Sequence, residues 1–306
     1  MTKRKEKILQ EKKLFSSKKL IIISIALAVV IVFGFLLSSF LLHTREVEFS
    51  LKTAIIDQLG EETQNSDFNE TGVVANILKN TGFDLSYYES KTVNVNFYKG
   101  LARYNYGIII LRAHSATREG ETIVDFFTSE EFNGDKHVSE QNNGWLTKGI
   151  YSWMPEKFYF AITPEFIENL EGCFPKSIVI AMGCNSLNKT CTEMAAAFIE
   201  KGAKAYLGWT GLVQCSHTDN ETVKLIRQLL VENKTLSGAV GTLDYDPLYG
   251  SRMDYYPLEA SDLRISSLIT EAKSSSNHQS AVAFFKPVSA VYITSFIMLE
   301  IRKKFR

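Results

Sequence analysis

The sequence predicts an α/β fold, a three-layer sandwich with a mainly parallel central sheet, preceded by one N-terminal transmembrane helix. Three observations favour this class. A lysine-rich segment precedes a long apolar run, β-branched apolar runs are typical of strands covered on both faces, and helical patterns alternate with them. The 306 residues suffice for an anchor and one sizeable domain. Lys+Arg and Asp+Glu both number 34, so the net charge is zero. The excess of basic residues that is typical of nucleic-acid-binding domains is missing.

The N-terminal segment has the pattern of a signal anchor. Residues 1–19 are basic, and residues 20–42 are uncharged and apolar. At about 1.5 Å per residue this run forms about 34 Å of helix, enough to cross a bilayer core of about 30 Å. A cleaved signal peptide is the main alternative, but its apolar core is only about 7–15 residues long. The positive-inside rule places residues 1–19 in the cytoplasm and the domain over 46–272 outside the cell membrane.

Sequons and cysteines bear on the outward placement. Asn-x-Thr sequons agree weakly with it, because they are common by chance; they begin at Asn69, Asn188, Asn220 and Asn233. The cysteines allow one clamp between Cys191 and Cys215, or four unpaired thiols that act as small apolar residues.

The first half of the domain alternates strands and helices in the β-α-β-α-β order typical of a parallel sheet. We expect a strand near Lys52–Leu59, a helix from Val73 that ends at Gly82, a short alternating strand over Thr92–Asn96, a helical turn over Tyr98–Arg103, and a buried strand from Tyr106 that runs into His114.

A polar insertion over 116–150 interrupts this order, and its Asn-Gly pairs favour a hairpin and a surface loop over a helix. Phe158–Ile162 could be an edge strand that lines the site. Thr163 before Pro164 marks the start of a helix that runs to about Glu171.

The second half continues the alternation. We expect a buried strand from Lys176 into Cys184, a helix over Thr192–Lys201 that ends at Gly202, a strand over Ala203–Trp209, an amphipathic helix over Asp219–Val231, and another helix that could begin at Leu236. Residues 273–306 form a polar linker and an apolar, then basic, tail. The tail could be a second membrane span, but Lys286, Pro287 and Glu300 favour a strand or an interfacial segment.

Two of the buried strands end in reactive side chains. In parallel sheets, ligands and chemistry collect beyond the carboxyl ends of the strands. If the two strands are neighbours, Cys184 is a thiol nucleophile and His114 its base. Gly183 would shape the turn, and the N–H groups of Cys184 and Ser115 would hold an oxyanion. Taken alone, His114 is more simply explained as a histidine at the end of a strand, and Cys184 as a buried cysteine.

Other chemistry finds less support. The sequence contains no C-x-x-C or H-x-x-x-H pair for a structural zinc site, and no P-loop, G-x-S-x-G or dinucleotide motif. We expect no metal and no organic cofactor.

With these residues in place, the His114 strand, the Cys184 strand and the segment Ala195–Trp209 resemble the caspase-like cysteine peptidases, and most closely their gingipain and CHAT (separase-related) branches. The resemblance covers about residues 50–245 and implies a caspase-like three-layer sandwich. It implies a Cys184/His114 dyad that cleaves a protein or peptide substrate through an acyl-enzyme. It also implies an acidic wall for a basic P1 side chain, for which Asp219 is the candidate, with a helix N-cap as its alternative role. Trp209 would line the cleft or pack in the core.

The sequence departs from the family at two positions. Ser115 replaces the glycine that usually follows the histidine, and a glycan on Asn188 would crowd the nucleophile. A catalytically inactive interaction or sensory domain with the same fold is therefore the alternative function.

Overall fold

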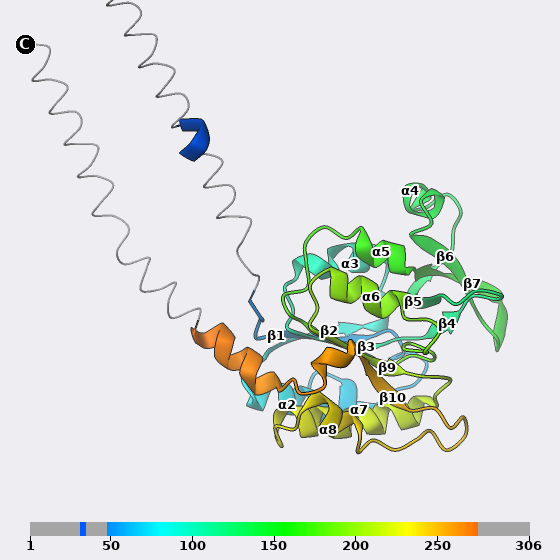
Figure 1. Ribbon diagram of the computed structural model, residues 1–306. Helices are drawn as coiled ribbons and strands as arrows, with labels where there is room; N and C mark the ends of the chain where they lie inside the picture. Colours follow the sequence, from blue (N-terminus) through cyan, green and yellow to red (C-terminus); the bar gives the residue numbers. More distant parts are fainter. Residues whose placement is uncertain (1–30, 35–47, 275–306) are drawn as a thin grey trace, which may run out of the picture. The chain divides into compact units, whose positions relative to one another are not determined.

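The computed structural model describes residues 31–34 and 48–274 (Figure 1). Residues 31–34 are helical. Within these two ranges, the structure has no helix that is both long and apolar enough to cross a membrane. The predicted span over 20–42 lies outside the described residues except for 31–34, and so does the predicted tail segment beyond 274. Both stay predictions.

The central sheet of the described domain has six strands in the order β10-β9-β8-β3-β1-β2. All neighbours are parallel except β10, which is antiparallel to β9. The strands are β1 (Lys52–Asp57), β2 (Asp84–Glu89), β3 (Ile108–Arg112), β8 (Ile178–Ala181), β9 (Ala205–Trp209) and β10 (Met253–Tyr256). This arrangement confirms a mixed α/β fold with a mostly parallel sheet.

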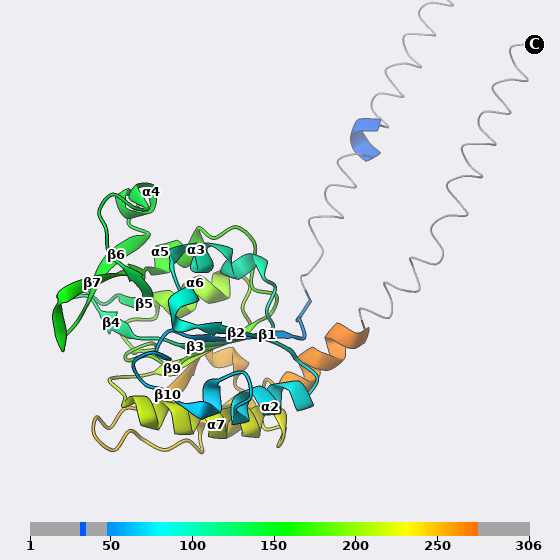
Figure 2. The same ribbon diagram turned by 180° about the vertical axis from the view of Figure 1, so that it is seen from behind.

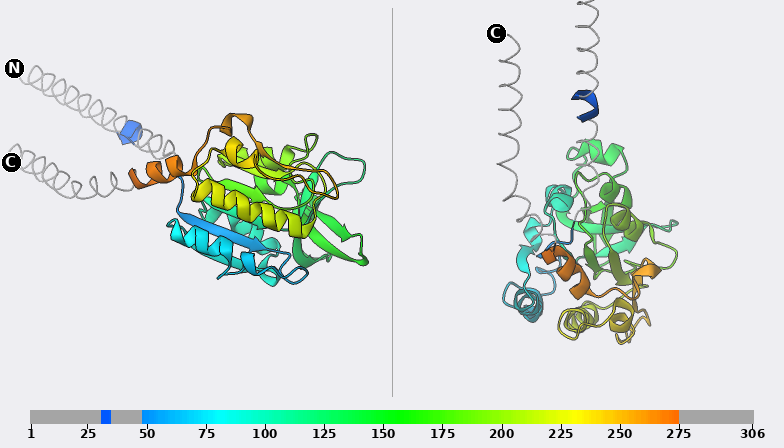
Figure 3. Two further views of the ribbon diagram at one scale, coloured as in Figure 1. Left: turned by 90° about the horizontal axis from the view of Figure 1, so that it is seen from below. Right: turned by 60° about the vertical axis from the view of Figure 1, so that its left-hand side comes forward.

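Helices cover both faces of this sheet, as in a three-layer sandwich (Figures 1 and 2). One face carries α3 (Val95–Gly100), the 3-10 turn η3 (Leu101–Arg103), α5 (Pro164–Glu168) and α6 (Glu193–Glu200). The other carries α2 (Val73–Asn80), α7 (Cys215–Leu230), α8 (Leu236–Val240) and a helix over 265–274. In Figure 3, α2 and α7 lie beside each other under the sheet.

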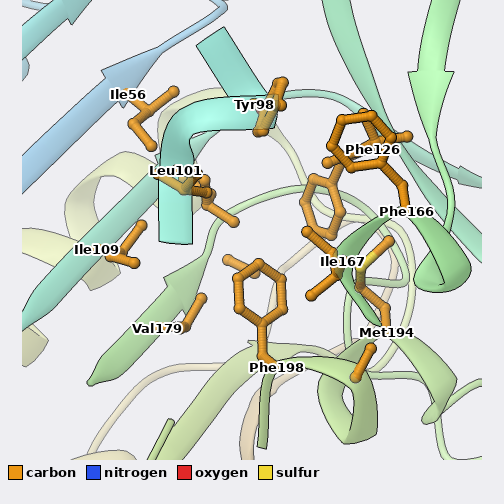
Figure 4. Packing of buried hydrophobic residues seen from close by; sticks show 14 of the residues in the cluster. Ile56, Tyr98, Leu101, Ile109, Phe126, Phe166, Ile167, Val179, Met194 and Phe198 are labelled. Carbon is orange, nitrogen blue, oxygen red and sulfur yellow. The ribbon is translucent and has the colours of Figure 1, made fainter. Parts of the chain in front are cut away.

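Each face of the sheet has its own hydrophobic core. Figure 4 shows the core between the sheet and α3, α5 and α6, where Ile109 and Val179 face Leu101, Ile167 and Phe198. The second core includes Ile110 and Ile180 and the apolar stripes of α2 and α7. Because β3 and β8 contribute to both cores, every residue of the two strands is buried, which explains why all of them except Arg112 are apolar.

The predicted insertion forms most of a second, antiparallel sheet of four strands in the order β4-β5-β7-β6 within the described chain. Its elements are β4 (Ser115–Thr117), β5 (Val124–Glu131), the short helix α4 (Val138–Asn142), β6 (Leu146–Tyr151) and β7 (Met154–Ile162). The expectation that Phe158–Ile162 is an edge strand is wrong, because β7 lies between β5 and β6.

Local capping explains several boundaries. Thr163 accepts a hydrogen bond from Phe166 N and starts α5 at Pro164, as predicted. The strand expected over Thr92–Asn96 is wrong: Asn94 caps α3 by accepting from Phe97 N, and the second strand of the sheet is β2. The chain leaves α6 through Gly202, whose φ of +105° suits a glycine after a helix.

Candidate functional site

The ends of β3 and β8 bring His114 and Cys184 to the same edge of the sheet. The two strands are parallel neighbours, with Leu111 paired with Ala181, and each candidate residue lies three positions farther along its strand. Neighbouring strands are about 4.8 Å apart. Beyond the strands, the Ser115 hydroxyl donates to the Cys184 carbonyl oxygen at 2.6 Å. This bond ties the two strand exits together.

Gly183 permits this close approach. A Cβ atom at this position would lie 2.2 Å from Ser115 Oγ and 2.6 Å from the Ala113 carbonyl oxygen, distances that real side chains do not tolerate. Two residues later, Asn185 takes up a left-handed conformation with φ of +57°. The chain therefore turns sharply around Cys184 as it leaves the sheet.

The Cys184 thiol is half-buried against the loop between β9 and α7. Its Sγ lies 3.4 Å from Val213 N, which donates to it, and 3.6 Å from Val213 O. Burial raises the pKa of the thiol, and the Val213 N–H only partly offsets this effect. The thiol is therefore protonated at neutral pH in the resting structure.

The His114 ring is held by a carboxylate. Its Nε2 lies 3.0 Å from Glu62 Oε2, in the turn that follows β1. Burial lowers the pKa of His114, while Glu62 acts in the opposite direction. The neutral imidazole that results can accept a proton. Within residues 48–274 no hydrogen bond joins His114 to Cys184.

Backbone and aromatic contacts also fix His114. Its N–H donates to Gln58 Oε1 at 2.9 Å. The ring centroid lies 4.8 Å from that of Tyr151 and 5.2 Å from that of Trp153, both at the tip of the β6–β7 hairpin. Sequence reasoning missed these partners. Gln58 and Glu62 had a signal, because they lie at or just beyond the carboxyl end of the strand predicted near Lys52–Leu59.

Two backbone N–H groups, those of Ser115 and Cys184, lie at the exits of β3 and β8. Phe127 N donates to the His114 carbonyl, so Ser115 forms a non-hydrogen-bonded pair with Phe126 and its own N–H points away from β5. Ser115 N lies 3.0 Å from the position that a Cβ on Gly183 would take. The Cys184 N–H has no acceptor in another residue of the described chain. Both predicted oxyanion donors therefore lie at the strand exits.

Asp219 has a different environment from the one expected for a substrate pocket. It is 3% exposed inside α7, and its oxygens accept from Arg112 at 2.8 and 2.9 Å and from Asn65 at 2.8 Å. The N-cap alternative is also wrong, because α7 begins at Cys215. This carboxylate faces the Arg112 guanidinium at the end of β3.

Trp209 and the cysteines take the simpler of their two expected roles. Trp209 is fully buried, and its indole N–H donates to Thr218 Oγ1 at 2.8 Å, so it packs in the core. All four cysteines have free thiols, so the clamp between Cys191 and Cys215 is absent from the described domain. The Asn188 side chain accepts a hydrogen bond from Thr190 N at 3.1 Å in a turn just past Cys184.

Metal-ligating side chains do not gather in the described ranges: no group of three or more His, Cys, Asp or Glu could hold an ion there. The comparisons with known proteins identify no relative: no protein-family model matches this chain, and no curated protein matches it.

Proposed function

We propose that this chain is a membrane-anchored, caspase-like cysteine endopeptidase with Cys184 as nucleophile and His114 as general base. The observation that carries the proposal is the hydrogen bond from Ser115 Oγ to the Cys184 carbonyl, because it joins the exits of two parallel strands that end in a histidine and a cysteine. The proposed nucleophile and the proposed base follow different strands, and the parallel pairing of these strands brings the two residues to the same edge of the sheet.

The proposed reaction needs only groups of the chain, the peptide and water. The Cys184 sulfur attacks the scissile carbonyl carbon while its proton passes to His114, and the N–H groups of Cys184 and Ser115 hold the oxyanion. The carbon–nitrogen bond then breaks, and His114 gives the proton to the leaving amine. Water attacks the thioester, with His114 again as base, and releases a carboxylic acid and the free thiol.

The resting protonation states suit general-base catalysis. Burial disfavours both the thiolate of Cys184 and the imidazolium of His114, so the resting pair is neutral. The imidazole can therefore take the proton as the bond to the substrate forms. Glu62 then stabilises the imidazolium and keeps the ring oriented.

Covalent labelling tests the dyad. We expect a peptide acyloxymethyl ketone, from a panel with Arg, Lys, Asn, Asp or Leu at P1, to label Cys184, with mass spectrometry to locate the adduct. Cys184→Ala and His114→Ala should abolish labelling with little change in melting temperature. Cys173→Ala, which removes another half-buried thiol, is the matched control and should label normally. A folded protein that no probe labels would favour the inactive interaction domain.

Membrane attachment is a separate part of the proposal, supported by the apolar run over 20–42. The full chain should stay with membranes during alkaline carbonate extraction, whereas a chain that starts at residue 46 should be released. Release of the full chain would refute the anchor and leave the peptidase proposal intact.

A further inference from the structure

The tip of the β6–β7 hairpin presents an unusual tryptophan. Ser152 and Trp153 form the turn between the two strands. Trp153 is 60% exposed, although tryptophan side chains are highly buried on average. Its ring stacks on Tyr151, with centroids 5.0 Å apart and an angle of 7° between the planes. The neighbouring Tyr151 ring is buried, so the stack has one covered and one open side.

This exposed indole is rigidly supported. The Tyr151 hydroxyl accepts from Gln58 Nε2 at 3.1 Å, and the same glutamine accepts from the His114 N–H. Tyr151 also packs with Phe127 and Ala161 in a small core of the second sheet. Binding to a preordered aromatic ring costs little conformational entropy, which is why such residues dominate many binding sites.

Trp153 lies on the histidine side of the dyad. Its ring centroid is 5.2 Å from that of His114, with an angle of 55° between the planes. Cys184 Sγ instead faces Val213, in the loop after β9. In peptide hydrolysis the general base later protonates the leaving amine. The half of the substrate that leaves therefore lies beside His114, within reach of the exposed indole.

We infer that Trp153 binds the side chain of the first substrate residue after the scissile bond and that this side chain is apolar or aromatic. The inference rests on the proposed peptidase function and names part of its substrate. The open indole surface offers apolar contact. Two acidic groups around the candidate site are engaged, since Glu62 pairs with His114 and Asp219 binds Arg112.

Cleavage-site mapping tests this selectivity. The full-length chain in detergent is incubated with a proteome-derived peptide library, and mass spectrometry reads the residues on both sides of each cut. We expect Phe, Tyr, Leu and Met to be enriched directly after the cut. The best sequence is then made as two quenched fluorescent peptides, with Phe or Gly at this position. We expect kcat/KM to be about tenfold higher for Phe, the scale at which a hydrophobic pocket discriminates.

Substitutions on the hairpin separate binding from positioning. In Trp153→Ala the Phe-to-Gly ratio should fall toward one, and Trp153→Phe should keep part of it. The matched control is Phe158→Ala, which removes an exposed aromatic ring of the adjoining strand β7, where Phe158 contacts Lys148. This control should keep the wild-type ratio.

Several results would overturn the inference while the proposed function stands. The acyloxymethyl ketone probes have no residue on the leaving side, so they can label Cys184 whether or not Trp153 binds substrate. If they label it, the inference is overturned by equal frequencies of all residues directly after the cut, or by a library that stays uncut. An unchanged ratio in Trp153→Ala would also do so. An equal loss for both peptides would make Trp153 only a support for His114. Enrichment of Lys or Arg would assign the selectivity to Glu62. Failure of all probes to label the folded protein rejects the peptidase itself, and this inference with it.

Discussion

The buried ion cluster at the end of β3 makes a strong prediction for the substitution Arg112→Met. Arg112 is 0% exposed, and its guanidinium donates to Asp57 at 2.6 Å and to both oxygens of Asp219. Methionine keeps much of the volume but leaves two buried carboxylates without a cation. Breaking a buried ion pair in this way costs about 3–5 kcal/mol. Because one cation serves two carboxylates here, we expect the free energy of unfolding to fall by about 5 kcal/mol.

Urea unfolding of the purified protein measures this loss. With a slope of about 2–3 kcal/mol per molar urea, the midpoint should fall by about 2 M. Arg103→Met is the matched control: its ion pair with Glu171 is largely exposed and should contribute about 1 kcal/mol or less. A midpoint shift below about 0.5 M for Arg112→Met would refute the reasoning.

The same cluster connects stability to the candidate site. Arg112 Nη2 also donates to the carbonyl and hydroxyl oxygens of Thr63, at 2.8 and 3.0 Å. Thr63 follows Glu62, which holds the His114 ring.

A triple variant tests the cause of the stability loss. When Asp57→Asn and Asp219→Asn are added to Arg112→Met, most of the stability should return, because no buried charge is left unpaired.

Two further predictions concern the site itself. In Glu62→Gln the pKa of His114 should fall, because the carboxylate raises it against the lowering effect of burial; the acid limb of probe labelling should then move to lower pH. An NMR titration that finds the pKa of His114 unchanged or higher would contradict this effect of Glu62. Gly183→Ala places a methyl group 2.2 Å from Ser115 Oγ and should cost about 1–3 kcal/mol and most of the labelling. Gly134→Ala, with open space around it, should be harmless, and equal stability of the two variants would argue against a tight turn.

The buried strands were the most predictable part of the fold. Both β3 and β8 are covered on two faces, so burial selects an apolar side chain at nearly every position. Arg112 is the exception in β3, and its carboxylate partners come from β1 and α7. Local pattern therefore located the strand exits, whereas the ion cluster that surrounds them depends on distant segments.

Competing local signals explain the elements that were misplaced. Thr92–Asn96 alternates polar and β-branched residues and so imitates a strand, but the Asn94 side chain caps a helix there. The true second strand, β2, lies at the edge of the sheet and is only half-buried, so its alternation is weak. The start of α7 was placed too late because Asp219 is typical of an N-cap, while tertiary contact with Arg112 draws it into the helix.

Topology and burial decide different properties of the candidate site. The parallel pairing of β3 with β8 is enough to place His114 beside Cys184, and both strands can be recognised from their sequences. The orientation and charge of the two groups depend on three loops that no local pattern connects to them. Glu62 holds the ring from a position 52 residues earlier in the sequence, the β6–β7 hairpin covers it, and Val213 contacts the thiol. These loops keep the pair neutral at rest, so the protonation states on which the proposed reaction depends are set by the contacts that bury the two residues.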